Sequence, residues 1–157
     1  MLKTRIIPTL LYKDHGLVKG VGFDSWRRVG TALPAIKVYC RREVDELVFV
    51  DISASPQARS VDCDEIDYLA DECFMPLTVG GGVRTIDDIR RLLRAGADKV
   101  LINTDAVDRP GLIREASDRF GAQCIVISID VKNIEGRYEV WTQCGTRKTS
   151  LDAVDWA

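Results

Sequence analysis

Two short turns carry the residue types best suited to binding a phosphate. Each turn joins an apolar run to an amphipathic run, the pattern of a strand followed by a helix. Backbone N–H groups at such a junction crowd around an anion, and glycine allows the close approach. Because neighbouring parallel strands end side by side, we expect the two turns to hold one phosphate together. The candidate ligands are Gly80, Gly81 and Gly82 in the first turn and Asn103 and Thr104 in the second.

Two carboxylates also stand where predicted strands end. Asp130 closes the apolar run 123–129, and partial desolvation there raises a carboxyl pKa towards neutrality, which suits acid–base chemistry. The alternative is a carboxylate that only accepts hydrogen bonds from loop amides. Asp51 closes the run 46–50 and is a candidate substrate ligand. The alternative is that its carboxylate accepts hydrogen bonds from nearby Ser53 and orders its own turn.

A long polar stretch, 13–30, is predicted as a loop and contains Lys19. Loops of this length in compact domains are commonly functional or mobile, so Lys19 can swing over an anionic ligand. A solvated, exposed lysine is the alternative. His15, the only histidine, has no second ligand or nucleophile near it in the sequence. The five cysteines contain no Cys-x-x-Cys pair, which indicates free thiols in a reducing compartment. We therefore expect neither a metal nor a cofactor.

The elements that must position these residues repeat along the chain. Apolar runs alternate with helical patterns, and one strand-helix unit recurs about every 24 to 29 residues after the first, as in a (β/α)8 barrel. Because a whole barrel needs roughly 200 to 250 residues, 157 residues predict an N-terminal half of a TIM barrel. We expect one α/β domain over 1–157, with about five parallel strands. A small hairpin is predicted at 138–142 and a final helix from Ser150.

Composition limits the partners. The chain is 46% hydrophobic and 29% charged, with a net charge of −2, so it offers no electrostatic reason to bind nucleic acid or an acidic membrane. No run approaches the roughly 20 apolar residues of a membrane span, and the first residues do not resemble a signal peptide. We expect a cytoplasmic protein. A half-barrel would expose its strand edges, which favours association with another copy.

Several segments together resemble the cyclase subunit of the imidazole glycerol phosphate synthase family. They are the run Arg5-Ile6-Ile7-Pro8 and the segments 18–20, 45–55, 77–82, 96–100, 102–104 and 123–130. The resemblance implies a TIM barrel of two similar halves and a lyase of histidine biosynthesis. It also implies that a separate glutaminase subunit supplies ammonia, which attacks a phosphorylated ribulosyl-type nucleotide substrate.

The resemblance also assigns roles around the substrate. It implies that the turns at Gly82 and at Asn103-Thr104 hold one terminal phosphate. Lys19 would lie in the loop that closes over the substrate, and Asp130 would be one of two catalytic aspartates.

Charged residues begin several of the predicted strands, at the floor of the predicted barrel. They are Arg5, Glu46 and Lys99. From position alone, charges on that face usually serve stability. The resemblance implies instead that these three form a gate at the ammonia entrance and that Asp98 contacts the glutaminase.

Leu11 stands where the family has its other catalytic aspartate. Leucine neither gives nor accepts a proton, so the two-carboxylate cycle cannot run as it does in the family. This departure favours a relative with altered chemistry. Relatives of this kind accompany glutaminase-like proteins in surface-polysaccharide (lipopolysaccharide) biosynthesis, where ammonia converts an acetamido sugar into an acetamidino sugar. A third alternative is a non-catalytic half-barrel that serves as a binding or assembly module.

Overall fold

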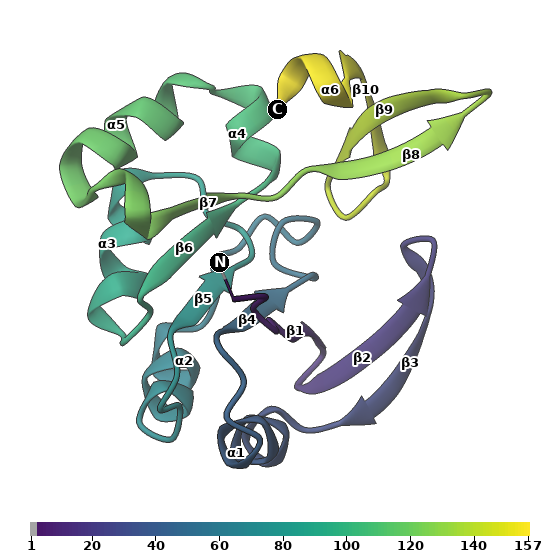
Figure 1. The fold of residues 1–157 in the computed structure, drawn as a ribbon. Helices are drawn as coiled ribbons and strands as arrows, with labels where there is room; N and C mark the ends of the chain where they lie inside the picture. The colour runs from purple at the N-terminus through teal and green to yellow at the C-terminus, as the bar shows by residue number, and fades with distance from the viewer. Residues whose placement is uncertain (1–2) are drawn as a thin grey trace.

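Five of the apolar runs form neighbouring parallel strands in the computed structural model, which describes residues 3–157 (Figure 1). The strands are β1 (Thr9–Lys13), β4 (Leu47–Asp51), β5 (Leu77–Gly80), β6 (Lys99–Ile102) and β7 (Ile125–Ile127). They lie in the order of the chain, and each pairs in parallel with the next. Their carboxyl ends therefore share one edge, as the sequence predicts.

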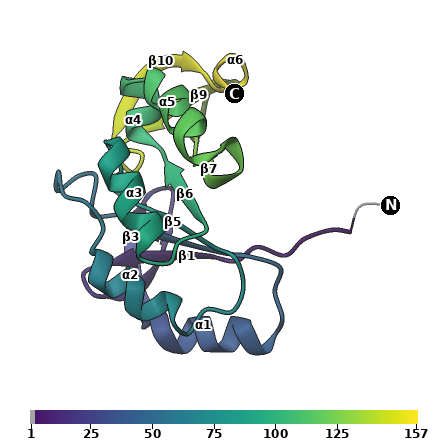
Figure 2. The same cartoon turned by 90° about the vertical axis from the view of Figure 1, so that its left-hand side faces the viewer.

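Helices cover one face of this sheet, as the two ribbon views show (Figures 1 and 2). They are α1 (Ala32–Arg41), α2 (Cys63–Ala70), α3 (Ile86–Arg94), α4 (Thr104–Asp108) and α5 (Gly111–Phe120), followed by the short 3-10 helix η1 (Ala122–Cys124). The apolar stripe of each longer helix packs on the strands, so Ile36, Ile66 and Ile89 are completely buried beside Val79 and Val100. This core fixes the strand ends that carry the candidate site.

Local signals set the ends of α3 and α5. Thr85 Oγ1 accepts a hydrogen bond from Asp88 N at 3.1 Å, and the Asp88 carboxylate accepts one from Thr85 N at 2.9 Å. This reciprocal capping box starts the helix. Pro110 precedes α5, and Gly121, with φ of 93°, follows it.

The stretch 13–30 is a β-hairpin, so the prediction of a long loop was wrong. Strands β2 (Gly16–Val21) and β3 (Asp24–Gly30) extend the sheet beyond β1 in antiparallel fashion. Two-residue turns, Asp14-His15 and Gly22-Phe23, precede and follow β2. All four turn residues have positive φ, between 48° and 66°, which tight hairpin turns require. His15 is therefore a turn residue.

A second, three-stranded sheet follows β7 (Figure 1). Its antiparallel strands are β8 (Asp130–Ile134), β9 (Arg137–Thr142) and β10 (Arg147–Asp152). The predicted hairpin is confirmed within a larger unit. The predicted helix from Ser150 was wrong, because Ser150 lies in β10 and α6 (Ala153–Trp156) begins after the capping residue Asp152. Asp130 was expected to end the fifth strand, but it begins β8 instead.

Strands β3 and β7 are the two edges of the seven-stranded sheet, and residues 3–157 do not close that sheet into a barrel. The first strand begins at Thr9 rather than at Arg5, so Leu11 lies mid-strand and not at its end. Over the same described residues, no helix is both long enough and apolar enough to cross a membrane.

Candidate functional site

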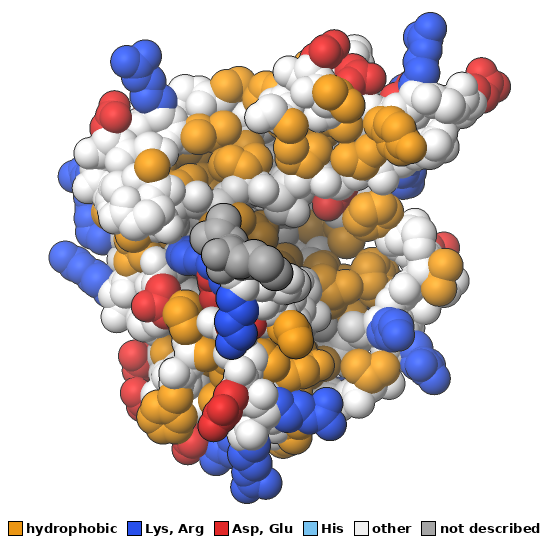
Figure 3. Space-filling view, in the orientation of Figure 1, with side chains coloured by type: hydrophobic (Ala, Val, Ile, Leu, Met, Phe, Trp, Pro, Cys, Tyr) orange, Lys and Arg blue, Asp and Glu red, His pale blue; other side chains and the backbone are white. Residues whose placement is uncertain are grey.

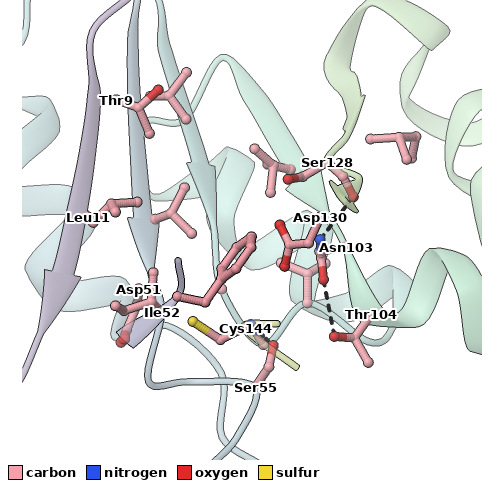
Figure 4. Close-up of a pocket in the computed structure, with 18 of the residues that line it drawn as sticks. Thr9, Leu11, Asp51, Ile52, Ser55, Asn103, Thr104, Ser128, Asp130 and Cys144 are labelled. Atoms are coloured by element: carbon pink, nitrogen blue, oxygen red, sulfur yellow. Dashed lines mark hydrogen bonds between the residues drawn. The ribbon is translucent and has the colours of Figure 1, made fainter. Parts of the chain in front are cut away.

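A cavity of about 340 Å³ lies at the carboxyl ends of the parallel strands (Figure 4). Its volume is in the range of small-molecule sites. The space-filling view shows one face of the molecule hollowed between the small sheet and the β2–β3 hairpin, with hydrophobic side chains around the hollow (Figure 3). The polar residues lining the cavity include Asp51, Ser55, Asn103, Thr104, Ser128 and Asp130. The cavity thus gathers residues of the two predicted turns and both predicted carboxylates.

The first turn is built from glycines because backbone packs against it. A Cβ on Gly81 would lie 2.4 Å from the Asp51 carbonyl oxygen, and a Cβ on Gly82 would lie 1.9 Å from that of Arg59. Both glycines have positive φ, 122° and 63°. They line the cavity, whereas Gly80 ends β5 outside the lining. The Gly82 N–H donates to Ser55 Oγ at 3.2 Å.

The second turn holds its two side chains in place. Asn103 Nδ2 donates to the Ser128 carbonyl oxygen at 2.9 Å, and Thr104 Oγ1 lies 3.3 Å from Asn103 Oδ1. The Thr104 hydroxyl also accepts a hydrogen bond from Gln143 N at 3.0 Å. Both residues line the same cavity as Gly82, so the structure brings the two turns together.

Asp51 is committed to its own loop. Its buried carboxylate accepts hydrogen bonds from Ser53 N at 2.9 Å and Ser53 Oγ at 2.7 Å. It also pairs with Arg59 Nη1 at 2.7 Å. The geometry therefore matches the alternative in which Asp51 orders the turn after β4, and its contact with substrate stays a prediction.

Asp130 has the less compensated carboxylate. Burial raises the pKa of its carboxyl group, and a polar contact from the Asn103 side chain offsets only part of that rise. Figure 4 shows Asp130 beside Asn103 on one side of the cavity and Leu11 on the other. Among the described residues that line the cavity, Asp51 and Asp130 alone have charged side chains. Since Asp51 is ion-paired, Asp130 is the group best placed for proton transfer.

The opposite, amino-terminal ends of the strands carry a charged network. Glu46 is buried and pairs with Lys99 Nζ at 2.6 Å through one carboxylate oxygen and with Arg5 through the other. The alternating charges predicted there do meet. Asp98 is close by in the chain, and its carboxylate accepts a hydrogen bond from Leu77 N at 2.8 Å, at the start of β5.

The sequence comparisons agree with this geometry. A family model described as "Histidine biosynthesis protein" matches residues 5–157. The chain belongs to that family. It is 52% identical, over 157 residues, to "Imidazole glycerol phosphate synthase subunit HisF" of Exiguobacterium sp. (strain ATCC BAA-1283 / AT1b). The alignment covers all of this chain and 62% of that relative, so the chain spans less than two thirds of the relative's length. The resemblance found in the sequence is thereby confirmed.

In this member of the histidine biosynthesis family, Lys19 is not brought to the cavity. It is exposed in β2 and lies opposite Arg27 in the hairpin ladder. Side chains alternate along a strand, so Lys19 shares a face with Leu17, which is buried in the core. The other face holds Gly20, against which Trp26 packs, and Trp26 lines the cavity. Closure of Lys19 over a ligand stays a prediction.

Phe23, Trp26 and Cys144 are among the lining residues of this family member that the sequence did not predict. Phe23 and Trp26 reach the cavity because 13–30 is a hairpin, which the loop prediction excluded. Cys144 reaches it from the β9–β10 turn. Burial raises the pKa of the Cys144 thiol, and the negative charge of Asp130 adds to the rise. A single cysteine in a turn gives no sequence signal of this placement.

Proposed function

We propose that the five parallel strands are the N-terminal part of a (β/α)8 barrel and that residues 1–157 form one domain of it. Supporting this, each of these strands pairs in parallel with the next one along the sheet, and helices connect them, as in such barrels. The 62% coverage of the HisF relative is consistent with a part of such a barrel. Association of two such units through exposed strand edges remains our prediction for the isolated chain.

The proposed activity is that of a lyase-type cyclase subunit of imidazole glycerol phosphate synthase in histidine biosynthesis. The substrate would be a phosphorylated ribulosyl-type nucleotide, and ammonia from a glutaminase subunit would attack it. One observation carries the proposal: in a chain of this family, Gly82, Asn103, Thr104 and Asp130 line one cavity.

Each part of the cavity has a chemical task in this proposal. The Gly82 turn and the Thr104 hydroxyl would bind a terminal phosphate through hydrogen-bond donors. Asp130 would donate or accept the proton at the reacting carbon or nitrogen, because burial keeps more of its carboxyl group protonated near neutral pH than an exposed aspartate. The apolar side, with Leu11 and Trp26, would exclude water from the reacting atoms.

On the other end of the strands, we propose that Arg5, Glu46 and Lys99 form the ammonia gate and that Asp98 contacts the glutaminase. The paired geometry supports this proposal, since a buried carboxylate held by two cations would block a path between the strand starts until one pair opened. Docking of a partner on this face would bring its ammonia to the amino ends of the strands.

Leu11 favours a second candidate function. It lines the cavity from β1, where a second carboxylate would be needed for the cyclase cycle. The alternative is an ammonia-using paralogue that converts an acetamido sugar into an acetamidino sugar in surface-polysaccharide biosynthesis. The gate would be kept while the chemistry of the cavity changes.

The test is thermal unfolding of the chain with and without the cyclase's diphosphorylated nucleotide substrate, with ammonium present and product absorbance followed. A ligand that binds only the folded state raises the melting temperature. Stabilisation with turnover supports the cyclase, and stabilisation without turnover supports altered chemistry. If neither occurs, an acetamido nucleotide sugar is tested in the same way. No effect of either ligand would contradict both enzyme proposals and leave the non-catalytic module.

A further inference from the structure

The β2–β3 hairpin and the β9–β10 turn belong to different sheets and meet beside the cavity. Phe23, in the turn that ends β2, packs against Gly145 in the β9–β10 turn. A Cβ on Gly145 would lie 2.5 Å from Cγ of the Phe23 ring, so no larger residue fits there without movement. Among the described residues, no backbone ladder joins the two sheets. Side chains must therefore hold the units together.

Lys132 of β8 is the group that reaches both units. Its Nζ donates to the Gly145 carbonyl oxygen at 2.7 Å. The same ammonium lies 3.8 Å from the centroid of the Trp141 ring and 5.7 Å from that of Phe23, within the range of cation–π attraction. Lys132 is half-buried, so water screens these contacts less than it would on an open surface.

The Trp141 ring depends on this packing. Its indole N–H is buried and has no hydrogen-bond partner within residues 3–157. A buried indole usually finds a partner for its N–H, so the ring is held here by its faces. The ammonium of Lys132 over one face is the polar contact that orients it.

The turn held by Lys132 also contacts the cavity. Gln143 N donates to Thr104 Oγ1 at 3.0 Å, and Cys144 lines the cavity wall. Phe23 lines the same cavity from the opposite unit. A shift of this turn would therefore release the Thr104 hydroxyl and widen the cavity at the same time.

We propose that Lys132 is a positioning residue of this site. It does not line the cavity; it holds the β9–β10 turn against the tip of the β2–β3 hairpin. Through Gly145 and Gln143 it fixes the direction of the Thr104 hydroxyl, and through Phe23 it fixes the aromatic side of the cavity. The expected effect on phosphate binding rests on the proposed function, but the mechanical link does not.

Amide hydrogen exchange of the whole chain tests the link without any ligand. Lys132→Met keeps the length of the side chain and removes the charge and the donor. We expect exchange in 20–26 and 143–146 to become about tenfold faster, since these segments lose a desolvated cation–π contact. Lys132→Arg keeps a cation that can stack and donate, and should restore slow exchange. Lys37→Met is the control, because Lys37 is an exposed lysine of α1 that pairs with Glu72, outside both segments.

The proposal is overturned if exchange in 20–26 is unchanged by Lys132→Met, or if it rises equally in α3, which would mean general loosening. If that variant does not fold, Phe23→Leu replaces it: the apolar contact stays, the aromatic face is lost, and exchange in 143–146 should rise. Unchanged exchange there would equally overturn the link.

Inorganic phosphate provides the second readout. Titration of phosphate into the unmodified chain tests the proposed anion site by itself. Absence of binding would count against the proposed function but not against the positioning role of Lys132. If phosphate binds, Lys132→Met should weaken binding severalfold and Lys132→Arg should recover it, because the Thr104 hydroxyl loses and regains its orientation. Equal affinity in all three proteins would contradict the positioning role.

Discussion

The two ends of the parallel strands place Glu46 and Asp130 in different electrostatic surroundings. At the amino ends, Glu46 is matched by two cations, Arg5 and Lys99. At the carboxyl ends, Asp130 faces an amide and no paired cation among the described residues, and burial raises its pKa. Complementary charge at one end favours closure and stability, whereas an uncompensated carboxylate at the other is typical of acid–base sites. The chain thus separates an ion-paired end, with Glu46, from a cavity end, with Asp130, along the same strands.

The largest effect is expected from Gly82→Ala at the cavity end. The new methyl group would clash with the Arg59 carbonyl and occupy an unfavourable φ of 63°. We expect a loss of about 2 to 4 kcal/mol in unfolding free energy, measured with urea. Gly136→Ala is the control, because Gly136 also has positive φ but nothing lies within 4 Å of its added Cβ. Equal losses in both variants would show that the close approach at Gly82 costs nothing.

The next effect is on chemistry rather than stability. Leu11→Asp places a second carboxylate across the cavity from Asp130, and general acid–base groups typically contribute large rate factors. With ammonium supplied directly, we expect product formation to rise about a hundredfold, the lower end of the range of roughly 10² to 10⁴ for such groups. Asparagine has the shape of aspartate but no ionisable proton. A similar gain in Leu11→Asn would therefore rule out an acid–base cause. No gain with Asp would count against a dormant cyclase site.

At the ion-paired end, Glu46→Gln leaves two cations facing a neutral amide. We expect a loss of about 1 to 2 kcal/mol in unfolding free energy, since removal of the buried carboxylate leaves Lys99, whose side chain is only 27% accessible, without its partner. Glu72→Gln breaks the exposed Lys37–Glu72 pair, whose side chains are 45% and 41% accessible, and should change stability by less than about 0.5 kcal/mol. Similar losses would mean that the Glu46 network is an ordinary surface pair.

The smallest effect concerns pH and separates two aspartates. Burial raises the pKa of Asp130, so its charged form destabilises the fold once pH exceeds that raised pKa. Asp130→Asn should therefore match or slightly exceed the parent in stability at neutral pH. This advantage should shrink as pH falls through the raised pKa towards 3.8, measured by thermal unfolding.

Asp88 provides the opposite sign for that experiment. Burial alone would raise the pKa of its carboxyl group, but hydrogen bonds from Thr85, Ser60, Arg84 and Arg91 lower it. Its charged form therefore stabilises the fold above about pH 3.8, and that contribution is lost as pH falls through the lowered pKa. Asp88→Asn should be less stable than the parent at neutral pH, with the gap narrowing in acid. The same slope in both variants would contradict the distinction between the two carboxylates.

The sequence predicted the repeated part of the fold well. Parallel strands covered by helices have continuous apolar runs, and helix ends such as Thr85 and Gly121 carry local capping signals. The placement of Asn103, Thr104 and Gly82 around one cavity followed from the rule that parallel strands end together.

The rest of the site depended on contacts that leave no periodic signal. The hairpin at 13–30 was missed because its turns use Asp14, His15 and Phe23 at positive φ, where glycine or asparagine is the usual signal. Because the hairpin was missed, the aromatic side of the cavity was missed as well. Likewise, Cys144 and Lys132 reach the site through tertiary packing of the small sheet, which single residues in a sequence do not reveal.

The order of the parallel strands also bears on how the molecule folds during synthesis. Each of the strands β4, β5, β6 and β7 pairs with the parallel strand that precedes it in the chain. The partner of each new strand has therefore already been synthesised. Closing one such unit joins residues between 21 positions apart, as in Thr78↔Lys99, and 39 positions apart, as in Thr9↔Val48, which keeps the loop entropy of each step modest. The sheet can therefore grow from its N-terminal side as the polypeptide leaves the ribosome, without waiting for distant segments.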